Sequence, residues 1–257
     1  MKAWCVVLVV AIIAQVLAWA WQRRTGNATL VDAVWAFGLG VAALIMAWLG
    51  EGATLPRLLL ATIAGLWSMR LGLHLVKRVL GESEDGRYAY LRQHWGNDQR
   101  KWFGFFMAQA LLIALFALPF VPVAANPEGD FGATDVFAIA IWVIAVVGEW
   151  RADAQLAAFR ANPANRGQVC RVGWWRYSRH PNYFFEWVHW FAYPLLAWGA
   201  PMAWLAWLGP ILMYIFLRWL SGIPWTEAQS LRSRGDAYRE YQRTTSMLIP
   251  WFPRSPR

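Results

Sequence analysis

Long apolar runs separated by short charged blocks form the dominant pattern along the chain. Each run approaches the roughly 20 residues that an α-helix needs to cross a bilayer. The pattern therefore predicts an all-α, polytopic membrane protein with seven transmembrane helices, organised as one domain over residues 1–257. The predicted spans lie at approximately 3–21, 29–49, 55–76, 103–124, 134–150, 183–199 and 201–220.

The first run has an alternative interpretation as a secretory signal peptide. Lys2 precedes it, and Ala18-Trp19-Ala20 resembles a cleavage site. The run is longer than the apolar core of a signal peptide, which has about 7 to 15 residues. We therefore expect a retained span.

Composition agrees with a membrane protein. Only 15% of the residues are charged, whereas roughly a quarter of a soluble protein is charged. The net charge of +9 is explained by basic residues in cytoplasmic loops, so we expect membrane lipid and no nucleic acid as partner. The two cysteines, Cys5 and Cys170, lie in different environments, and no Cys/His cluster has zinc spacing, so neither a disulfide nor a metal site is expected.

The distribution of basic residues predicts the orientation. Most of the Lys and Arg residues follow the first, third, fifth and last runs, while Lys2 and Arg57 lie on the opposite side. Because basic loops stay in the cytoplasm, the N-terminus should be outside and the C-terminus cytoplasmic. We expect a bacterial inner membrane, or one like that of the endoplasmic reticulum. The segments 77–101, 151–182 and 221–257 should then face the cytoplasm and carry the active site.

Ionisable residues inside the predicted spans are functional candidates, because each costs several kcal/mol unless it is paired. Asp32 lies early in the second run, and Arg70 and His74 lie one turn apart near the end of the third. The simpler interpretation is that Asp32 pairs with Arg70 or His74 and locks two helices together. This interpretation is compatible with a catalytic role.

A second group of polar residues surrounds the fifth and sixth runs. Glu149, Asp153 and Arg160 fall close to one stripe of a helix, and this stripe suits a polar cofactor with hydroxyls and phosphates. A solvated helix face is the alternative. In the segment 176–186, Pro181 fits a helix N-terminus, and Asn182 and Glu186 share a helix face with Glu186 inside the membrane.

The same segment offers an anion site, because Arg176 and Arg179 stand next to helix N-terminal N–H groups. A basic flank with a helix cap is the alternative interpretation, but a Glu186 buried in the membrane argues against it.

An acidic turn, Gly81-Glu82-Ser83-Glu84-Asp85-Gly86, interrupts an otherwise basic loop before Arg87 and Tyr88. A solvated turn is one interpretation. If the loop folds back over a site, Tyr88 and Tyr90 become possible proton donors.

Together these motifs resemble a known enzyme family. Arg179-His180-Pro181-Asn182-Tyr183 followed by Glu186 resembles the C-terminal signature of the steroid 5-alpha-reductase family. The similarity extends to Glu84-Asp85-Gly86-Arg87-Tyr88, to Asp153 with Arg160, and to Tyr238-Arg239-Glu240-Tyr241, and it covers approximately residues 30–250.

The resemblance implies a seven-helix membrane oxidoreductase that uses NADPH to reduce a carbon–carbon double bond conjugated to a carbonyl. Its substrate would be a lipophilic, steroid-like enone that enters from the lipid. Asp32 would polarise the substrate carbonyl, with His74, Tyr88 and Tyr183 as candidate proton donors.

For the cofactor, the resemblance assigns Asn182 and Glu186 to the nicotinamide and Asp153 to the ribose or adenine. The phosphates would be held by Arg87, Arg160, Arg171 and Arg179. The expected cofactor-binding set is completed by Glu149, Tyr183, Glu227 and Tyr241.

Two other functions remain open. A membrane methyltransferase that uses S-adenosylmethionine, of the isoprenylcysteine or phospholipid type, shares the Arg-His-Pro-x-Tyr motif. The acidic turn before Arg87-Tyr88 and the seven runs favour the reductase. A transporter or receptor is the non-enzymatic alternative, but a transporter should show helix breaks in mid-membrane, and here the polar residues gather toward one side.

Overall fold

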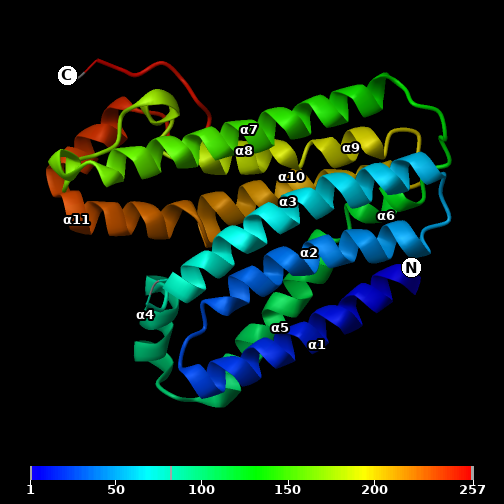
Figure 1. The fold of residues 1–257 in the computed structure, drawn as a ribbon, viewed down its shortest axis with the longest axis horizontal. Helices are drawn as coiled ribbons and strands as arrows, with labels where there is room; N and C mark the ends of the chain where they lie inside the picture. The colour runs from blue at the N-terminus through cyan, green and yellow to red at the C-terminus, as the bar shows by residue number, and fades with distance from the viewer. Residues whose placement is uncertain (1, 82, 256–257) are drawn as a thin grey trace. The chain divides into compact units, whose positions relative to one another are not determined.

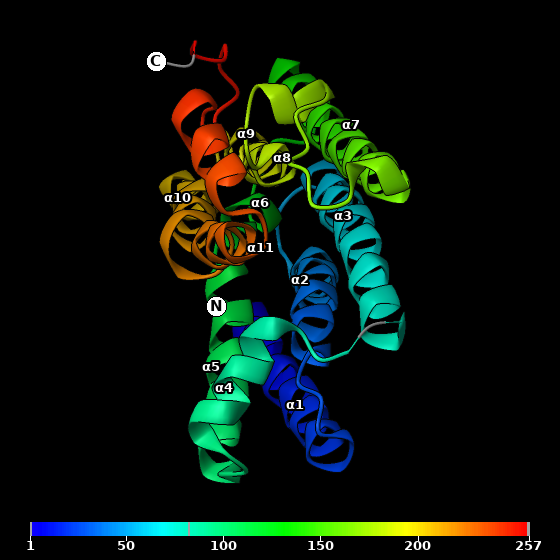
Figure 2. The same ribbon diagram turned by 90° about the vertical axis from the view of Figure 1, so that its left-hand side faces the viewer.

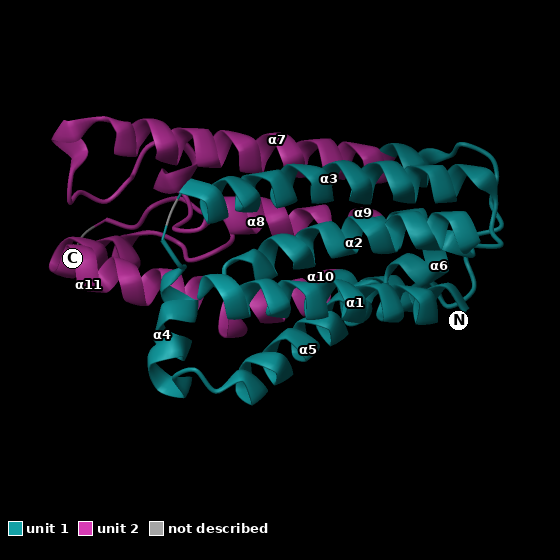
Figure 3. Cartoon of the chain, turned by 60° about the horizontal axis from the view of Figure 1, so that its bottom comes forward, with its two compact units in different colours: residues 1–136, 193–209 teal, residues 137–192, 210–257 magenta. Residues whose placement is uncertain are grey.

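In the computed structural model, which describes residues 2–81 and 83–255, the described chain is helical and divides into two compact units. Unit 1 comprises residues 1–136 and 193–209, and unit 2 comprises residues 137–192 and 210–257 (Figure 3). The chain passes between the units three times, so neither is one continuous segment. The expected single domain is not tested by this division and stays a prediction.

Unit 1 is built around four long helices, and α2 packs most extensively on α3 and then on α1 and α5 (Figure 1). The short helix α4 follows an acidic turn after α3 and is capped by the Asp85 side chain, which accepts a hydrogen bond from the Arg87 N–H. The helices are α1 (Lys2–Thr25), α2 (Leu30–Leu49), α3 (Thr54–Gly81), α4 (Gly86–Trp95), α5 (Gln99–Phe116) and α6 (Phe120–Ala124), followed late in the chain by α9 (Ala192–Leu196) and the 3-10 helix Ala203–Trp207.

Small residues allow α2 and α3 to approach closely. A Cβ atom on Gly40 would lie 2.2 Å from the Ser68 Oγ, and that hydroxyl donates a 2.8 Å hydrogen bond to the Ala36 carbonyl across the interface. Small side chains and hydroxyls that bond to backbone are the usual means of packing helices in a membrane, where no hydrophobic force drives them together.

Unit 2 is built on two long helices, α7 and α11, with the short helix α8 beside α7 (Figures 1 and 2). Pro181 is the first residue of α8, as the sequence predicted. The chain after α11 returns alongside the loop that precedes α8, through a parallel bridge between Ser178 and Ser246. The helices are α7 (Ala133–Ala161), α8 (Pro181–His189), α10 (Leu208–Ile215), the π-helix Phe216–Leu220 and α11 (Ile223–Thr244), with 3-10 turns at Pro163–Asn165 and Gly173–Arg176.

Several helices are long and apolar enough to cross a membrane, which supports an integral membrane protein. Five candidate spans occur among the described residues: Lys2–Thr25, Leu30–Leu49, Thr54–Gly81, Ala133–Ala161 and Ala203–Thr244. The remaining apolar runs do not form single long helices, so the seven spans stay a prediction. The orientation of the termini stays a prediction as well.

Prolines explain where those runs break. The predicted span 103–124 is divided because α5 ends at Phe116 and α6 is a separate short helix; Pro119 cannot donate to the Leu115 carbonyl. The predicted span 183–199 is divided between α8 and α9, because Pro194 cannot donate to the Trp190 carbonyl. Apolar length alone did not reveal these breaks.

A first prediction concerns the close contact of α2 and α3. Gly40→Ala should destabilise the protein by about 1 to 3 kcal/mol, because the added methyl group overpacks the interface. Gly65→Ala on α3 is the matched control, since its Cβ would meet nothing within 4 Å. Thermal unfolding in detergent measures both, and equal melting temperatures for the two variants would contradict the close packing.

A second prediction concerns the direction of α7. Ala164 and Asp130 are exposed beyond its two ends, so a spanning α7 places them on opposite sides of the membrane. With Cys5 and Cys170 replaced by Ala, Ala164→Cys should react with an impermeant maleimide only after the cells are permeabilised. Asp130→Cys should react in intact cells. The reverse pattern would refute the orientation, and labelling of both from one side would show that α7 does not span.

Candidate functional site

Glu84 and Asp85 of the acidic turn are tied to the start of α2, whereas Glu82 lies outside the described residues. The Glu84 carboxylate accepts a 2.8 Å hydrogen bond from the Ala28 backbone N–H. In the opposite direction, the Asp85 backbone N–H donates to the Thr29 Oγ1 at 2.9 Å. The turn is therefore not merely solvated, and it brings α4 next to Asp32.

Asp32 lies at the centre of a group of charged and phenolic side chains in unit 1. The Tyr88 hydroxyl donates to its Oδ1 at 2.5 Å, and the Arg87 Nη2 donates to its Oδ2 at 2.7 Å. Arg87 also contacts Asp85 at 3.0 Å, and Arg78 donates to the same Asp85 carboxylate at 3.0 Å. Two carboxylates and two guanidiniums thus balance each other around one buried phenol; we call these five residues the Asp32 cluster.

Burial and charge keep Tyr88 protonated. The side chain is only 4% exposed, and burial followed by the negative charge of Asp32 raises the pKa of the phenol well above its usual value, although Arg87 acts in the opposite direction. Burial alone would also raise the pKa of Asp85, but the hydrogen bonds and charge of Arg87 and the charge of Arg78 lower it. Tyr88 is therefore a neutral hydrogen-bond donor beside ionised groups.

Aromatic packing fixes α4 in this position. Arg92 forms two hydrogen bonds to Glu84, at 2.8 and 2.9 Å, and its guanidinium lies 4.7 Å from the centre of the Trp102 ring. Tyr88 and Trp102 belong to one buried cluster that also includes Val31 of α2. The Tyr88 ring is therefore packed in a buried cluster while its hydroxyl is bound to Asp32.

The partners of Asp32 differ from those that the simpler interpretation proposed. Within the described residues its carboxylate is bound by Arg87 and Tyr88, not by Arg70 or His74. His74 is exposed on α3, so its imidazole does not join the Asp32 cluster. Arg87, expected at a phosphate, is engaged by two carboxylates instead.

A second group of polar side chains, in unit 2, surrounds Glu227 of α11. Its Oε1 accepts from the Arg179 Nε at 2.6 Å and lies 3.3 Å from the His180 Nε2. Its Oε2 accepts from the Gln242 amide at 2.9 Å. Arg179 also donates to the backbone carbonyls of Gln242 and Thr245. These contacts hold the loop before α8 against α11. Arg179 therefore has a structural role here and does not form an open anion site.

His180 and two tyrosines add further contacts that stabilise the loop before α8. Burial lowers the pKa of His180, against the opposing effect of Glu227, which favours a neutral imidazole. Its ring stacks on Tyr183, with centroids 5.5 Å apart, and the Tyr183 hydroxyl lies 3.2 Å from the Thr226 Oγ1. Tyr241 donates to the carbonyls of Trp175 and Ser178, and so it supports the loop rather than standing open for a ligand.

The remaining candidates gather where α7 meets α8. The Asn182 amide donates to the Asp153 carboxylate at 3.2 Å. This bond brings together the polar stripe of α7 and the polar face of α8, which were predicted separately. Glu149 and Glu186 are each only 8% exposed. Glu186 accepts a 3.3 Å hydrogen bond from the Trp190 indole. Two buried carboxylates thus lie on the same two adjoining helices as the half-buried Asp153 and Asn182; we call these four residues the α7–α8 site.

Two expected arginines lie at the edge of unit 2. Arg160 is exposed in the last turn of α7. Arg171 is 3.5 Å from the Glu240 carboxylate and lies over the Tyr241 ring. Both side chains are exposed. Sequence reasoning gave no role to Gln242 or Thr226, whose importance appears only because α11 folds against the loop before α8.

Searches of curated proteins and of solved structures find no match to the chain. One family model, described as "Protein of unknown function (DUF1295)", matches residues 18–245. The match includes both the Asp32 cluster and the α7–α8 site. The chain therefore belongs to the DUF1295 family.

Proposed function

We propose that this protein is an NADPH-dependent membrane reductase of a carbon–carbon double bond conjugated to a carbonyl, acting on a lipophilic, steroid-like enone. The observation that carries the proposal is the buried Tyr88 phenol, 2.5 Å from the Asp32 carboxylate that Arg87 also binds. The resemblance of the Arg179–Glu186 segment to steroid 5-alpha-reductases and the apolar helices of the chain support it.

The Asp32 cluster suits the carbonyl end of such a substrate. Addition of hydride to the β-carbon moves negative charge onto the carbonyl oxygen, and a fixed donor at that oxygen lowers the barrier. Tyr88 keeps its proton because its pKa is raised, so its O–H can turn from Asp32 to the oxygen and donate there. Asp32 positions the hydroxyl, and Arg87 balances the charge of Asp32.

The α7–α8 site fits the polar groups of NADPH. Asn182 and Glu186 lie one turn apart on α8 and offer an amide and a carboxylate to a carboxamide. Asp153, next to Asn182, can accept hydrogen bonds from ribose hydroxyls. Arg160 and Arg171 are exposed arginines of the same unit, and a planar guanidinium binds phosphate well. When bound, the cofactor supplies the hydride, while the chain supplies position and charge.

Replacing the phenol tests the proton donor. Tyr88→Phe should reduce turnover of a 3-oxo-4-ene steroid by about 100-fold or more, since a positioned acid contributes about 10²- to 10⁴-fold. NADPH affinity should stay unchanged, because Tyr88 belongs to the carbonyl side. Asp32→Asn should behave in the same way. Single-turnover reduction and fluorescence titration of NADPH measure the two quantities.

The matched control for this test is Tyr90→Phe. Tyr90 lies two residues further along α4 and is 48% exposed, so its loss should leave turnover unaltered. A Tyr88→Phe protein that elutes and melts like the parent and also reduces the enone at the parent rate would remove the phenol from the mechanism.

A separate substitution tests the cofactor side. Glu186→Gln should weaken NADPH binding or lower the rate by at least about tenfold, because a hydrogen bond to a charged group contributes roughly 1.5–3 kcal/mol. The control is Glu51→Gln, an exposed carboxylate between α2 and α3, which should change nothing. If the parent bound NADH as tightly as NADPH, the assignment of the arginines would fail.

The same measurements distinguish a reductase from a methyltransferase. If the protein were a methyltransferase, the parent would bind S-adenosylmethionine and not NADPH, and Glu186→Gln would weaken the binding of S-adenosylmethionine. That result would overturn the reductase proposal.

A further inference from the structure

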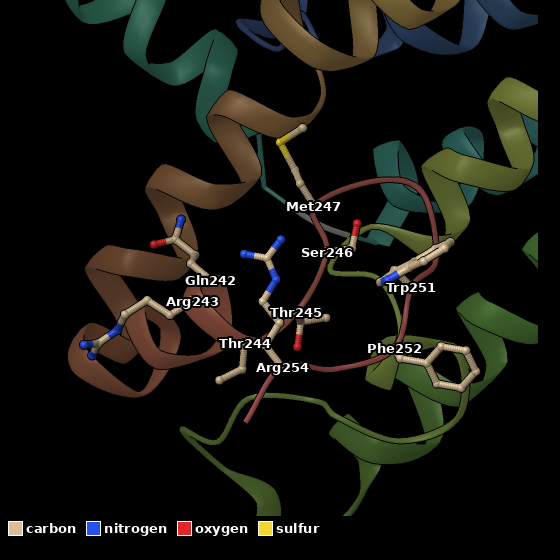
Figure 4. Close-up of a pocket in the computed structure, with 9 residues that line it drawn as sticks. All are labelled: Gln242, Arg243, Thr244, Thr245, Ser246, Met247, Trp251, Phe252 and Arg254. Carbon is tan, nitrogen blue, oxygen red and sulfur yellow. The ribbon is translucent and has the colours of Figure 1, made fainter. Parts of the chain in front are cut away.

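A cavity of about 330 Å³ lies at the C-terminal end of unit 2 (Figure 4). Its walls come from the last turn of α11 and from the tail that follows, within residues 242–254. No residue of the Asp32 cluster or the α7–α8 site lines it. A volume of this size falls at the lower end of the range of small-molecule sites.

Backbone hydrogen bonds fix the walls of this cavity. The Arg179 N–H donates to the Ser246 carbonyl at 2.8 Å, and the Trp251 N–H donates to the Tyr177 carbonyl at 2.9 Å. The loop is closed by the Arg254 N–H, which donates to the Thr244 carbonyl at 2.8 Å. The tail is thus held in place, and the cavity does not depend on a freely moving end of the chain.

The cavity is positively charged. Of its described lining residues, Arg243 and Arg254 are cationic and none is acidic. Figure 4 shows the Arg254 side chain extending toward the middle of the labelled residues, while Arg243 points outward. In the part of the chain that the structure describes, neither guanidinium has an ion pair, whereas those of Arg179 and Arg171 are bound to carboxylates. Arg254 is therefore a cation directed into a cavity without an anion of its own.

Two residues with neutral hydroxyls also line the cavity, Thr245 and Ser246. Their hydroxyls make no hydrogen bond with other described residues, whereas the Thr244 hydroxyl donates to the Glu240 carbonyl. A guanidinium together with hydroxyl donors matches the oxygens of a phosphate group, which Arg binds through two parallel hydrogen bonds.

We propose that this cavity binds a phosphate group, from either a phospholipid headgroup or a soluble phosphate. The neighbouring side chains favour the lipid: Trp251 is 68% and Phe252 76% exposed, and aromatic side chains beside basic ones are typical of the membrane–water boundary. The site is separate from the proposed reductase chemistry and does not require it.

The test uses the full chain purified in detergent, with Arg254→Gln as the variant. The matched control is Arg232→Gln, an exposed arginine of α11 that does not line the cavity. Each protein is titrated with phosphatidylglycerol, phosphatidylcholine, inorganic phosphate and NADPH. Melting temperature reports stabilisation, and native mass spectrometry counts the retained lipids.

Phosphatidylglycerol should raise the melting temperature of the parent and of Arg232→Gln, and Arg254→Gln should need about tenfold more lipid, since loss of one charge-assisted pair contributes about a factor of ten or more. Preference for phosphatidylglycerol over inorganic phosphate identifies the lipid as the source. The reverse preference, lost in Arg254→Gln, identifies a soluble phosphate.

Two results would overturn the inference. One is equal binding of every phosphate compound by the parent and Arg254→Gln, which would show that Arg254 holds no phosphate. The other is a weakened affinity of Arg254→Gln for NADPH, which would make the cavity part of the cofactor site. An intact phosphate response without any NADPH binding would leave this inference standing while the proposed function fails.

Discussion

The pairing of Asp32 with Arg87 and Tyr88 is the interaction on which the candidate chemistry of unit 1 depends. A carboxylate near lipid is costly unless its charge is balanced and its oxygens accept hydrogen bonds. Both oxygens of Asp32 meet that condition, one through the phenol and one through the guanidinium. The residues that satisfy it lie 55 and 56 positions further along the chain. The acidic turn must therefore fold back onto α2, and the same contacts make Tyr88 a buried, protonated donor.

Unit 2 also contains a carboxylate whose charge is balanced by bound donors, but there the pairing supports a loop. Glu227 is bound by Arg179, His180 and Gln242. These contacts hold the loop before α8 against α11, and the next residue of the motif but one, Asn182, bonds to Asp153. The motif that resembles the reductases thus combines two tasks in consecutive residues. Its arginine and histidine hold the loop, and its asparagine is left on the side of the proposed cofactor.

The burial of the arginines and the carboxylates that they contact separate structural roles from binding roles. Arg87 and Arg179 are both engaged by carboxylates, so removing either would leave a charge unpaired and should destabilise the fold. Arg160 and Arg171 are exposed, although Arg171 lies 3.5 Å from the Glu240 carboxylate. Arg254 lines a cavity that has no acidic side chain among its described lining residues. A count of basic residues cannot make this distinction, because all five look alike along the chain.

The sequence by itself determined that the protein is helical and membrane-embedded, because apolar length is a local property. It also identified α7 and the start of α8, and it singled out Asp32, Asn182 and Glu186, since charge or amide groups stand out in apolar surroundings. Only the tertiary structure decided that Tyr88, not His74, contacts Asp32, and that Arg179 serves Glu227. Partners so distant in sequence are chosen by how helices pack, and helix periodicity carries no information about that choice.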